Sequence, residues 1–246
     1  MNGENHILLQ ELCLVFNLFI CFGIPLGGLG ILRKKGYPIG KAFCLGMAAF
    51  TISQICIRIP LLQLVLPQMT WYQDLSTNPW MYGLFLGFTA GIFEEGARVI
   101  FLKIGIKKQL DFSDALSFGL GHGGIEAMLL VGISCIATMF ALPNDIALAA
   151  SLSYDELLLG GIERIFALSF HIGATLLVAY GMHHKKTVWY TIIALLLHTL
   201  LDAPIVILPQ VFKVGTFGLE SYLAILSTLV LIFGICLWHK KQKKKG

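Results

Sequence analysis

Long apolar stretches dominate the chain and predict helices that cross a membrane. A helix needs about 20 apolar residues to span the hydrocarbon core of a bilayer. The predicted spans cover about 7–32, 42–67, 80–102, 113–140, 157–182, 188–212 and 217–238. Strand-like alternation of apolar and polar positions is absent, which argues against a β-barrel. We therefore expect an all-α, polytopic membrane protein of about seven transmembrane helices, forming a single integral membrane domain over residues 1–246.

The composition leads to the same protein class. Of the 246 residues, 57% are hydrophobic and only 13% are charged, whereas soluble domains carry roughly 25% charged residues. The mean hydropathy is +0.79. These values exclude a soluble globular domain, a coiled coil and a disordered chain. The net charge of +4 comes from the loops and the tail, so it calls for no nucleic-acid partner.

Basic residues gather in alternate loops and predict the orientation. Fourteen of the eighteen Lys and Arg residues fall on one side of the predicted spans. They are Arg33, Lys34, Lys35, Lys41, Lys103, Lys107, Lys108, Lys185, Lys186 and the five lysines of 240–245. Cytosolic loops are enriched in Lys and Arg. We expect the N-terminus outside, the C-terminus in the cytosol, and a location in a cell membrane.

A small set of ionisable residues remains inside the predicted spans. Even on the most lenient scale, a charge at the bilayer centre costs about 2.5 kcal/mol, so such residues indicate a functional site or face one another. The set comprises Arg58, Glu94, Glu95, Arg98, Glu126, Glu163, Arg164 and Asp202, with His122, His171 and His198. Of these, Arg58, Glu163 and Arg164 lie nearer the outer side, and we expect them to form structural charge pairs.

Glutamate and histidine recur at one depth in four consecutive spans. Counted from the basic ends at 1.5 Å per residue, Glu94, Glu95, His122, His171 and His198 lie roughly 12–18 Å deep. Imidazoles with a carboxylate are typical ligands of a catalytic zinc ion, which lowers the pKa of a bound water to about 7. A further glutamate can then act as general base. The layer predicts a metal-dependent hydrolytic site.

The spacing within each helix supports this site. His122 and Glu126 are four residues apart, as are His198 and Asp202, so each pair lies on one helix face. The second carboxylate of such a pair can orient its histidine or replace it as a ligand. Arg98 follows the two glutamates by three and four residues and can reach either. We expect Arg98 to position a glutamate or to stabilise an oxyanion.

Three motifs resemble those of known intramembrane metalloproteases. Glu94-Glu95-Gly-Ala-Arg98 resembles the first motif of the CAAX-protease/bacteriocin-processing (Abi, CPBP) and PrsW proteins. Phe118-Gly-Leu-Gly-His122 is similar to their FxxxH motif. His198-Thr-Leu-Leu-Asp202 is similar to their last motif, HxxxN or HxxxD. All three occur in the order that these proteins have.

A fourth motif narrows the resemblance to one branch. Arg164, His171 and Thr175 match an R-x6-H-x3-T spacing associated with PrsW. Together with the string 119–126, which ends in Glu126, this motif most closely resembles the YhfC family. The match covers about 80–205, the expected metalloprotease core. The glycines of that string also spell GxGxxG, but inside an apolar span we expect them to serve helix packing.

The resemblance implies a metal-dependent endopeptidase that has its site inside the bilayer and cuts a membrane-embedded or membrane-associated protein or peptide. Zinc is the cofactor expected from the ligand types. The resemblance also implies that Glu94 or Glu95 activates water, while His122 and His198 bind the metal. PrsW proteins have glutamate in the second motif and this chain has both His122 and Glu126, so either can be the ligand. His171 is the third expected ligand.

The depth of the layer predicts that water and substrate enter from the cytosolic side or laterally from lipid. Two other functions are compatible with the same residues. A proton- or cation-coupled transporter would use them as a relay, and a non-catalytic membrane adaptor or immunity protein would retain only the scaffold. Several substrates also fit the sequence, among them prenylated proteins, signal peptides, anti-sigma factors and bacteriocin precursors.

Overall fold

The computed structural model describes residues 3–37, 40–106 and 110–242, which form helices and connecting turns without a β-strand. The helices are α1 (Gly3–Leu18), α2 (Ile24–Lys34), α3 (Gly40–Phe50), α4 (Thr70–Ser76), α5 (Pro79–Gly105), α6 (Phe112–Glu126), α7 (Ile133–Ala141), α8 (Ile146–Ser151), α9 (Tyr154–His183), α10 (Thr187–Phe212) and α11 (Thr216–Gln242). Short π-helical segments continue α1 into α2, α3 toward α4, and α6 into α7, at Phe19–Gly23, Thr51–Arg58, Leu61–Val65 and Ala127–Gly132. The all-α prediction is confirmed.

Six segments within the described residues are long and apolar enough to cross a membrane. They are His6–Lys34, Gly40–Gln68, Phe112–Asn144, Tyr154–His183, Thr187–Phe212 and Thr216–His239. The remaining predicted span, 80–102, falls on α5. The 27 residues of this helix, at 1.5 Å each, are long enough to cross a bilayer. Its apolar run is interrupted by three charged residues, Glu94, Glu95 and Arg98. The chain is a multi-pass membrane protein, and the seventh crossing stays a prediction.

Local capping signals determine where the site-bearing helices begin. Before α5, the side chain of Asn78 accepts hydrogen bonds from the backbone N–H groups of the first turn, at 3.0 and 3.3 Å. Asp111 and Asp114 form a capping box at the start of α6. Ser153 caps α9 in the same way. Such caps satisfy N–H groups that have no partner within the helix, and they set the residue at which each helix begins.

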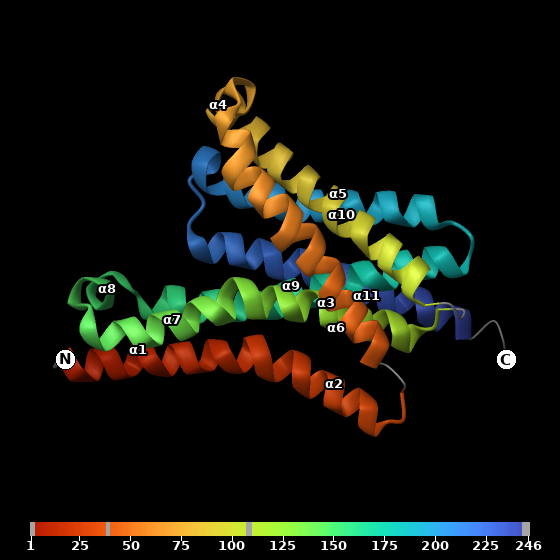
Figure 1. Ribbon diagram of the computed structural model, residues 1–246, viewed down its shortest axis with the longest axis horizontal. Coiled ribbons are helices and arrows are strands. Elements are labelled where there is room, and N and C mark those ends of the chain that lie inside the picture. Colours follow the sequence, from red (N-terminus) through yellow and green to blue (C-terminus); the bar gives the residue numbers. More distant parts are fainter. Residues whose placement is uncertain (1–2, 38–39, 107–109, 243–246) are drawn as a thin grey trace.

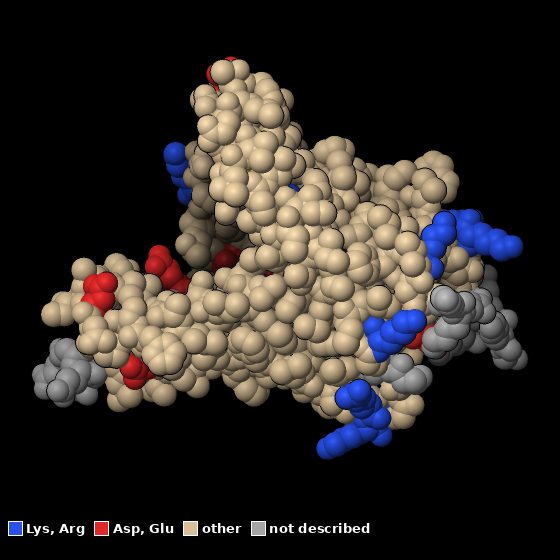
Figure 2. Space-filling view, viewed as in Figure 1, with Lys and Arg blue, Asp and Glu red and all other residues tan. Residues whose placement is uncertain are grey.

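The helices pack so that α9 lies at the centre (Figure 1). It contacts α11, α6, α10 and α1, while α5 lies along α10 and α3 lies along α6. The end of α2, the start of α3, the end of α5 and the turn after α9 lie at the same end of the molecule. We call it the basic end, because these segments carry Arg33, Lys34, Lys41, Lys103 and Lys185. Figure 2 shows most Lys and Arg side chains at this end, while acidic side chains lie at the opposite end. Of the predicted basic cluster, Lys107, Lys108 and 243–245 lie outside the described residues.

Glycines allow α3 and α6 to approach closely. A Cβ atom on Gly121 would lie 2.1 Å from the carbonyl oxygen of Phe43, and one on Gly46 would lie 2.1 Å from that of Phe118. No other residue fits at either position without moving a backbone. The packing role expected for Gly121 is confirmed, and the close approach places His122, the next residue, beside α3.

Candidate metal centre

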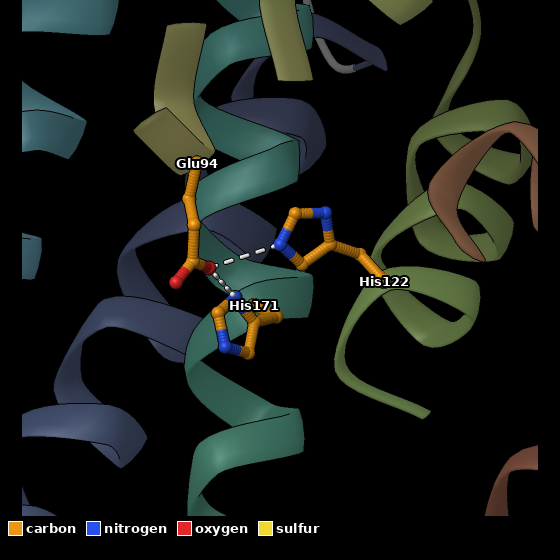
Figure 3. Close-up of side chains that lie close together, drawn as sticks. All are labelled: Glu94, His122 and His171. Atoms are coloured by element: carbon orange, nitrogen blue, oxygen red, sulfur yellow. Dashed lines mark hydrogen bonds and ion pairs between the residues drawn. The ribbon is translucent and has the colours of Figure 1, made fainter. Parts of the chain in front are cut away.

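Three imidazoles from different helices surround the carboxylate of Glu94, and Figure 3 shows two of them, those of His122 and His171. The Nε2 atom of His122 lies 3.0 Å from Oε2 of Glu94, and Nδ1 of His171 lies 3.7 Å from the same oxygen. The Nε2 atom of His198 lies 3.6 Å from the other oxygen, Oε1. The four residues lie on α6, α9, α10 and α5, and all are buried. The structure therefore brings together the layer that the sequence predicts.

The donor atoms of this cluster could hold a metal ion. Glu94, His122 and His171 each offer one donor atom, and these atoms lie within 4.8 Å of one another. Two imidazoles and a carboxylate suit zinc and similar divalent ions. The ring of His122 packs between Phe50 and Phe118, and its Nδ1 atom has no hydrogen-bond partner. Its Nε2 atom therefore provides the polar contact of this ring, and that atom faces the cluster.

Glu95 and Arg98 lie behind the cluster and form a buried ion pair. The guanidinium of Arg98 contacts the two carboxylate oxygens of Glu95 at 2.8 and 3.1 Å, and both side chains have 0% exposure. Oε1 of Glu95 lies 3.0 Å from Nδ1 of His198. Arg98 also lies 3.2 Å from Nδ1 of His171 and donates to Thr175. The pair therefore holds two of the three imidazoles in place.

Glu126 contacts the outer nitrogen of His171, and Asp202 lies near the nitrogen of His198 that also faces Glu94. The Nε2 atom of His171 lies 2.5 Å from Oε2 of Glu126. Oδ2 of Asp202 lies 3.6 Å from Nε2 of His198. In this arrangement His122 faces Glu94, whereas Glu126 contacts the far side of His171. The two residues of the second motif thus occupy different positions in the site.

The three residues expected to form structural charge pairs have different contacts. Arg164 pairs with Glu163 and contacts Glu126 at 3.0 Å. Arg58 instead donates to Oε1 of Gln54 at 3.1 Å and to the carbonyl of Leu86 at 2.6 Å, and among the described residues no carboxylate oxygen lies within 4.0 Å of it. Arg58 is therefore tied to amide and carbonyl oxygens.

Gln54 is a site residue that was not predicted from the sequence. Its Nε2 atom donates to Oε1 of Glu94 at 2.6 Å, and the side chain is 2% exposed. Arg58, one turn further along, fixes the other end of the amide. The available signal was an amide side chain in the apolar run 42–67 with Arg58 four residues later. Because Gln54 is uncharged, it falls outside the set of ionisable residues within the spans.

We expect Gln54→Leu to lower the stability of the protein. The substitution keeps the approximate volume but leaves Oε1 of Glu94 and one nitrogen of Arg58 without their partner. A buried polar group without its partner costs about 1–3 kcal/mol. Thermal unfolding of the detergent-purified protein measures the loss. Gln63→Leu, at an exposed glutamine of the following π-helical segment, is the control, and equal unfolding temperatures for both variants would contradict the assignment.

A cavity of about 100 Å³ adjoins the cluster and is large enough to hold water. Its polar lining consists of Glu94, Glu126, Glu163, Arg164, His171, His198, Asp202 and Ser227. Glu95 and Arg98 do not line it. Glu94 is therefore the member of the glutamate pair that borders the cavity, and Arg98 lies behind it.

Comparison of the chain with known proteins agrees with the resemblance that its motifs show. A family model described as "YhfC intramembrane metalloprotease" matches residues 20–145 and 140–227. The chain is also 29% identical over 247 residues to a Bacillus subtilis (strain 168) protein described as "Uncharacterized membrane protein YhfC", covering 92% of this chain and 93% of that protein. No solved structure matches significantly. The family matches span most of the chain and include every residue of the cluster, so this chain belongs to the YhfC intramembrane metalloprotease family.

Proposed function

We propose that the protein is a metal-dependent endopeptidase that hydrolyses a peptide bond of a membrane-associated protein or peptide. The observation that carries this proposal is the convergence of three imidazole nitrogens on the carboxylate of Glu94, beside a polar cavity. Family membership supports the same activity. We further propose the cytoplasmic membrane of a bacterium as its location, with the basic end in the cytosol.

His122, His171 and His198 are the residues that would hold the metal. Zinc is the ion that three imidazoles and a water-accessible position favour. When bound, such an ion polarises the substrate carbonyl and makes water nucleophilic at neutral pH. The donor set fits, because His122 and His171 belong to the group whose donor atoms lie within 4.8 Å of one another. The Nε2 atom of the buried His198 faces the same carboxylate from the other side, at 3.6 Å.

Glu94 acts as the general base. Its carboxylate borders the cavity, so it can take a proton from the attacking water and return it to the leaving amine. Gln54 holds one of the two oxygens, at 2.6 Å, which fixes the direction of the carboxylate. Glu95 and Arg98 position the histidines from outside the cavity, and Glu126, which borders the cavity, contacts His171. Of the two glutamates in the first motif, the structure thus favours Glu94 for the chemistry.

Elemental analysis of the purified protein tests the metal assignment. We expect about one zinc ion per chain in the wild type and loss of the ion in both His122→Ala and His198→Ala, because each variant removes an imidazole donor. His184→Ala is the control, since this histidine lies in the loop after α9. Retention of the metal in both cluster variants would contradict the assignment.

The shape of the cavity disfavours an open channel. A channel needs a polar path that connects the site to both membrane faces at once, whereas a transporter opens it to each face in turn. On the basic side of the cluster, the described residues form a close-packed apolar group that includes Leu102, Phe118, Leu176 and Ala194, each 0% exposed. The polar lining of the cavity continues only toward the other end.

A further inference from the structure

The cavity extends from the cluster in one direction along the helices. On α9, which runs toward the basic end, the lining residues other than His171 precede it and include Glu163 and Ala167. On α10, which runs away from the basic end, the lining continues beyond His198 to Ile205. Both helices therefore place the cavity between the cluster and the end opposite the basic one.

Helix α11 also lines the cavity, and its lining residues again lie toward the end opposite the basic end. Ser227 and Leu223 line the cavity and lie in the first half of this helix, whereas Trp238, near its basic end, packs in the apolar group. The hydroxyl of Ser227 is buried and has no hydrogen-bond partner among the described residues. An unpartnered hydroxyl in a polar cavity is free to bond water or a substrate. Figure 2 shows a hollow with acidic side chains toward the end opposite the basic one.

The cluster is closed on its other side. The Glu95–Arg98 pair and Thr175 lie directly behind the histidines, and each is 0% exposed. Beyond them lies the apolar group, and a Cβ atom on Gly181 would come within 2.5 Å of Tyr190. From the sequence, water and substrate are expected to enter from the cytosolic side or from lipid. The structure offers no polar opening among the described residues at the basic end.

The lining of the cavity is acidic. Four carboxylates, those of Glu94, Glu126, Glu163 and Asp202, face one guanidinium, that of Arg164. A cleft lined by charges of one sign concentrates ions of the opposite sign. Without a metal ion, this cavity therefore favours cationic groups over anionic ones.

We propose that water and the scissile segment of the substrate reach the site from the end opposite the basic end, through the acidic cavity between α9, α10 and α11. The substrates are then membrane-anchored polypeptides whose scissile segment lies at that face. With the basic end in the cytosol, that face is extracytoplasmic. The substrate class rests on the proposed protease function, whereas the direction of access does not.

Thiol labelling of single-cysteine variants tests the direction of access. Ala167→Cys and Ser227→Cys are made in a full-length background in which the six native cysteines are replaced. Sealed vesicles of each orientation are treated with a membrane-impermeant methanethiosulfonate. We expect both cysteines to react only when the reagent is added at the end opposite the basic one. Ala179→Cys, on α9 at 0% exposure and toward the basic end, is the matched control and should not react from either side.

Two exposed positions report which face the reagent reaches. Lys35→Cys marks the basic end and Ser76→Cys marks the opposite end. Reaction of the cavity cysteines together with Lys35→Cys would overturn the proposal, and so would reaction from neither side while Ser76→Cys reacts. The assay needs no catalysis, so an inactive protein can still support the access route.

The acidic lining is tested with the same variants. A cationic methanethiosulfonate should react with Ala167→Cys about tenfold faster than an anionic reagent of similar size, because the carboxylates attract it. At Ser76→Cys we expect a smaller difference. The substrate class is tested by mapping new N-termini in the membrane fraction of producing cells. Cleavage sites at cytosolic ends of transmembrane segments would overturn it, and sites at extracytoplasmic ends would support it.

Discussion

Glu94→Gln is expected to abolish proteolysis while leaving the protein folded and metal-loaded. General-base catalysis contributes roughly 100- to 10,000-fold to a rate, and glutamine cannot accept the proton. The amide keeps the size of the carboxylate in a pocket where the side chain is 7% exposed. The measurement is quantitative N-terminal proteomics of membranes from cells that produce wild type or variant. New N-termini present with the wild type should fall to background.

Two further measurements make this result specific. Elemental analysis should give the wild-type metal content, because the three imidazoles remain. Glu156→Gln, an exposed glutamate at the start of α9, is the matched control and should retain full activity. Loss of the metal from Glu94→Gln would instead identify Glu94 as a ligand, and wild-type activity would contradict its role as the base.

The fold and the depth of the site could be predicted from the sequence because both follow from simple rules. Apolar stretches of about 20 residues indicate spans, and ionisable side chains inside them need partners. His122, His171 and His198 share one depth with Glu94 whatever the exact ends of their helices. The structure accordingly places these four side chains in one cluster.

Which of the two glutamates, Glu94 or Glu95, faces the cavity could not be predicted from the sequence. Neighbouring residues on a helix point about 100° apart, so only one of the two can face the cavity. Which one does so depends on how α5 rotates against α9 and α10, and sequence spacing does not encode that rotation. Arg98 is compatible with both glutamates by spacing, and in the structure it pairs with Glu95.

The side from which water and substrate reach the site also could not be predicted from the sequence. Depth measured along a span gives the distance to each face but not which side is filled by side chains. The cytosolic route was expected because the layer lies nearer the basic end. In the structure that shorter path is filled by Leu102, Phe118 and Ala194, while the longer one contains the polar cavity.

Arg98→Met is expected to produce the largest loss of stability of any variant considered. Removing one partner of a buried ion pair costs about 3–5 kcal/mol, because the remaining charge is buried without compensation. Arg98 has 0% exposure and contacts Glu95, His171 and Thr175. We expect a lower unfolding temperature in detergent and loss of the metal, since the pair also holds two imidazoles.

A second substitution distinguishes the buried charge from simple loss of packing. In Glu95→Leu with Arg98→Met no unpaired charge remains, so part of the lost stability should return. Metal binding should stay impaired, because Nδ1 of His198 no longer has its carboxylate partner. Arg33→Met, at an exposed arginine of the basic end, should change the unfolding temperature little. If Arg98→Met unfolded at the wild-type temperature, the buried pair would contribute nothing to the scaffold of the site.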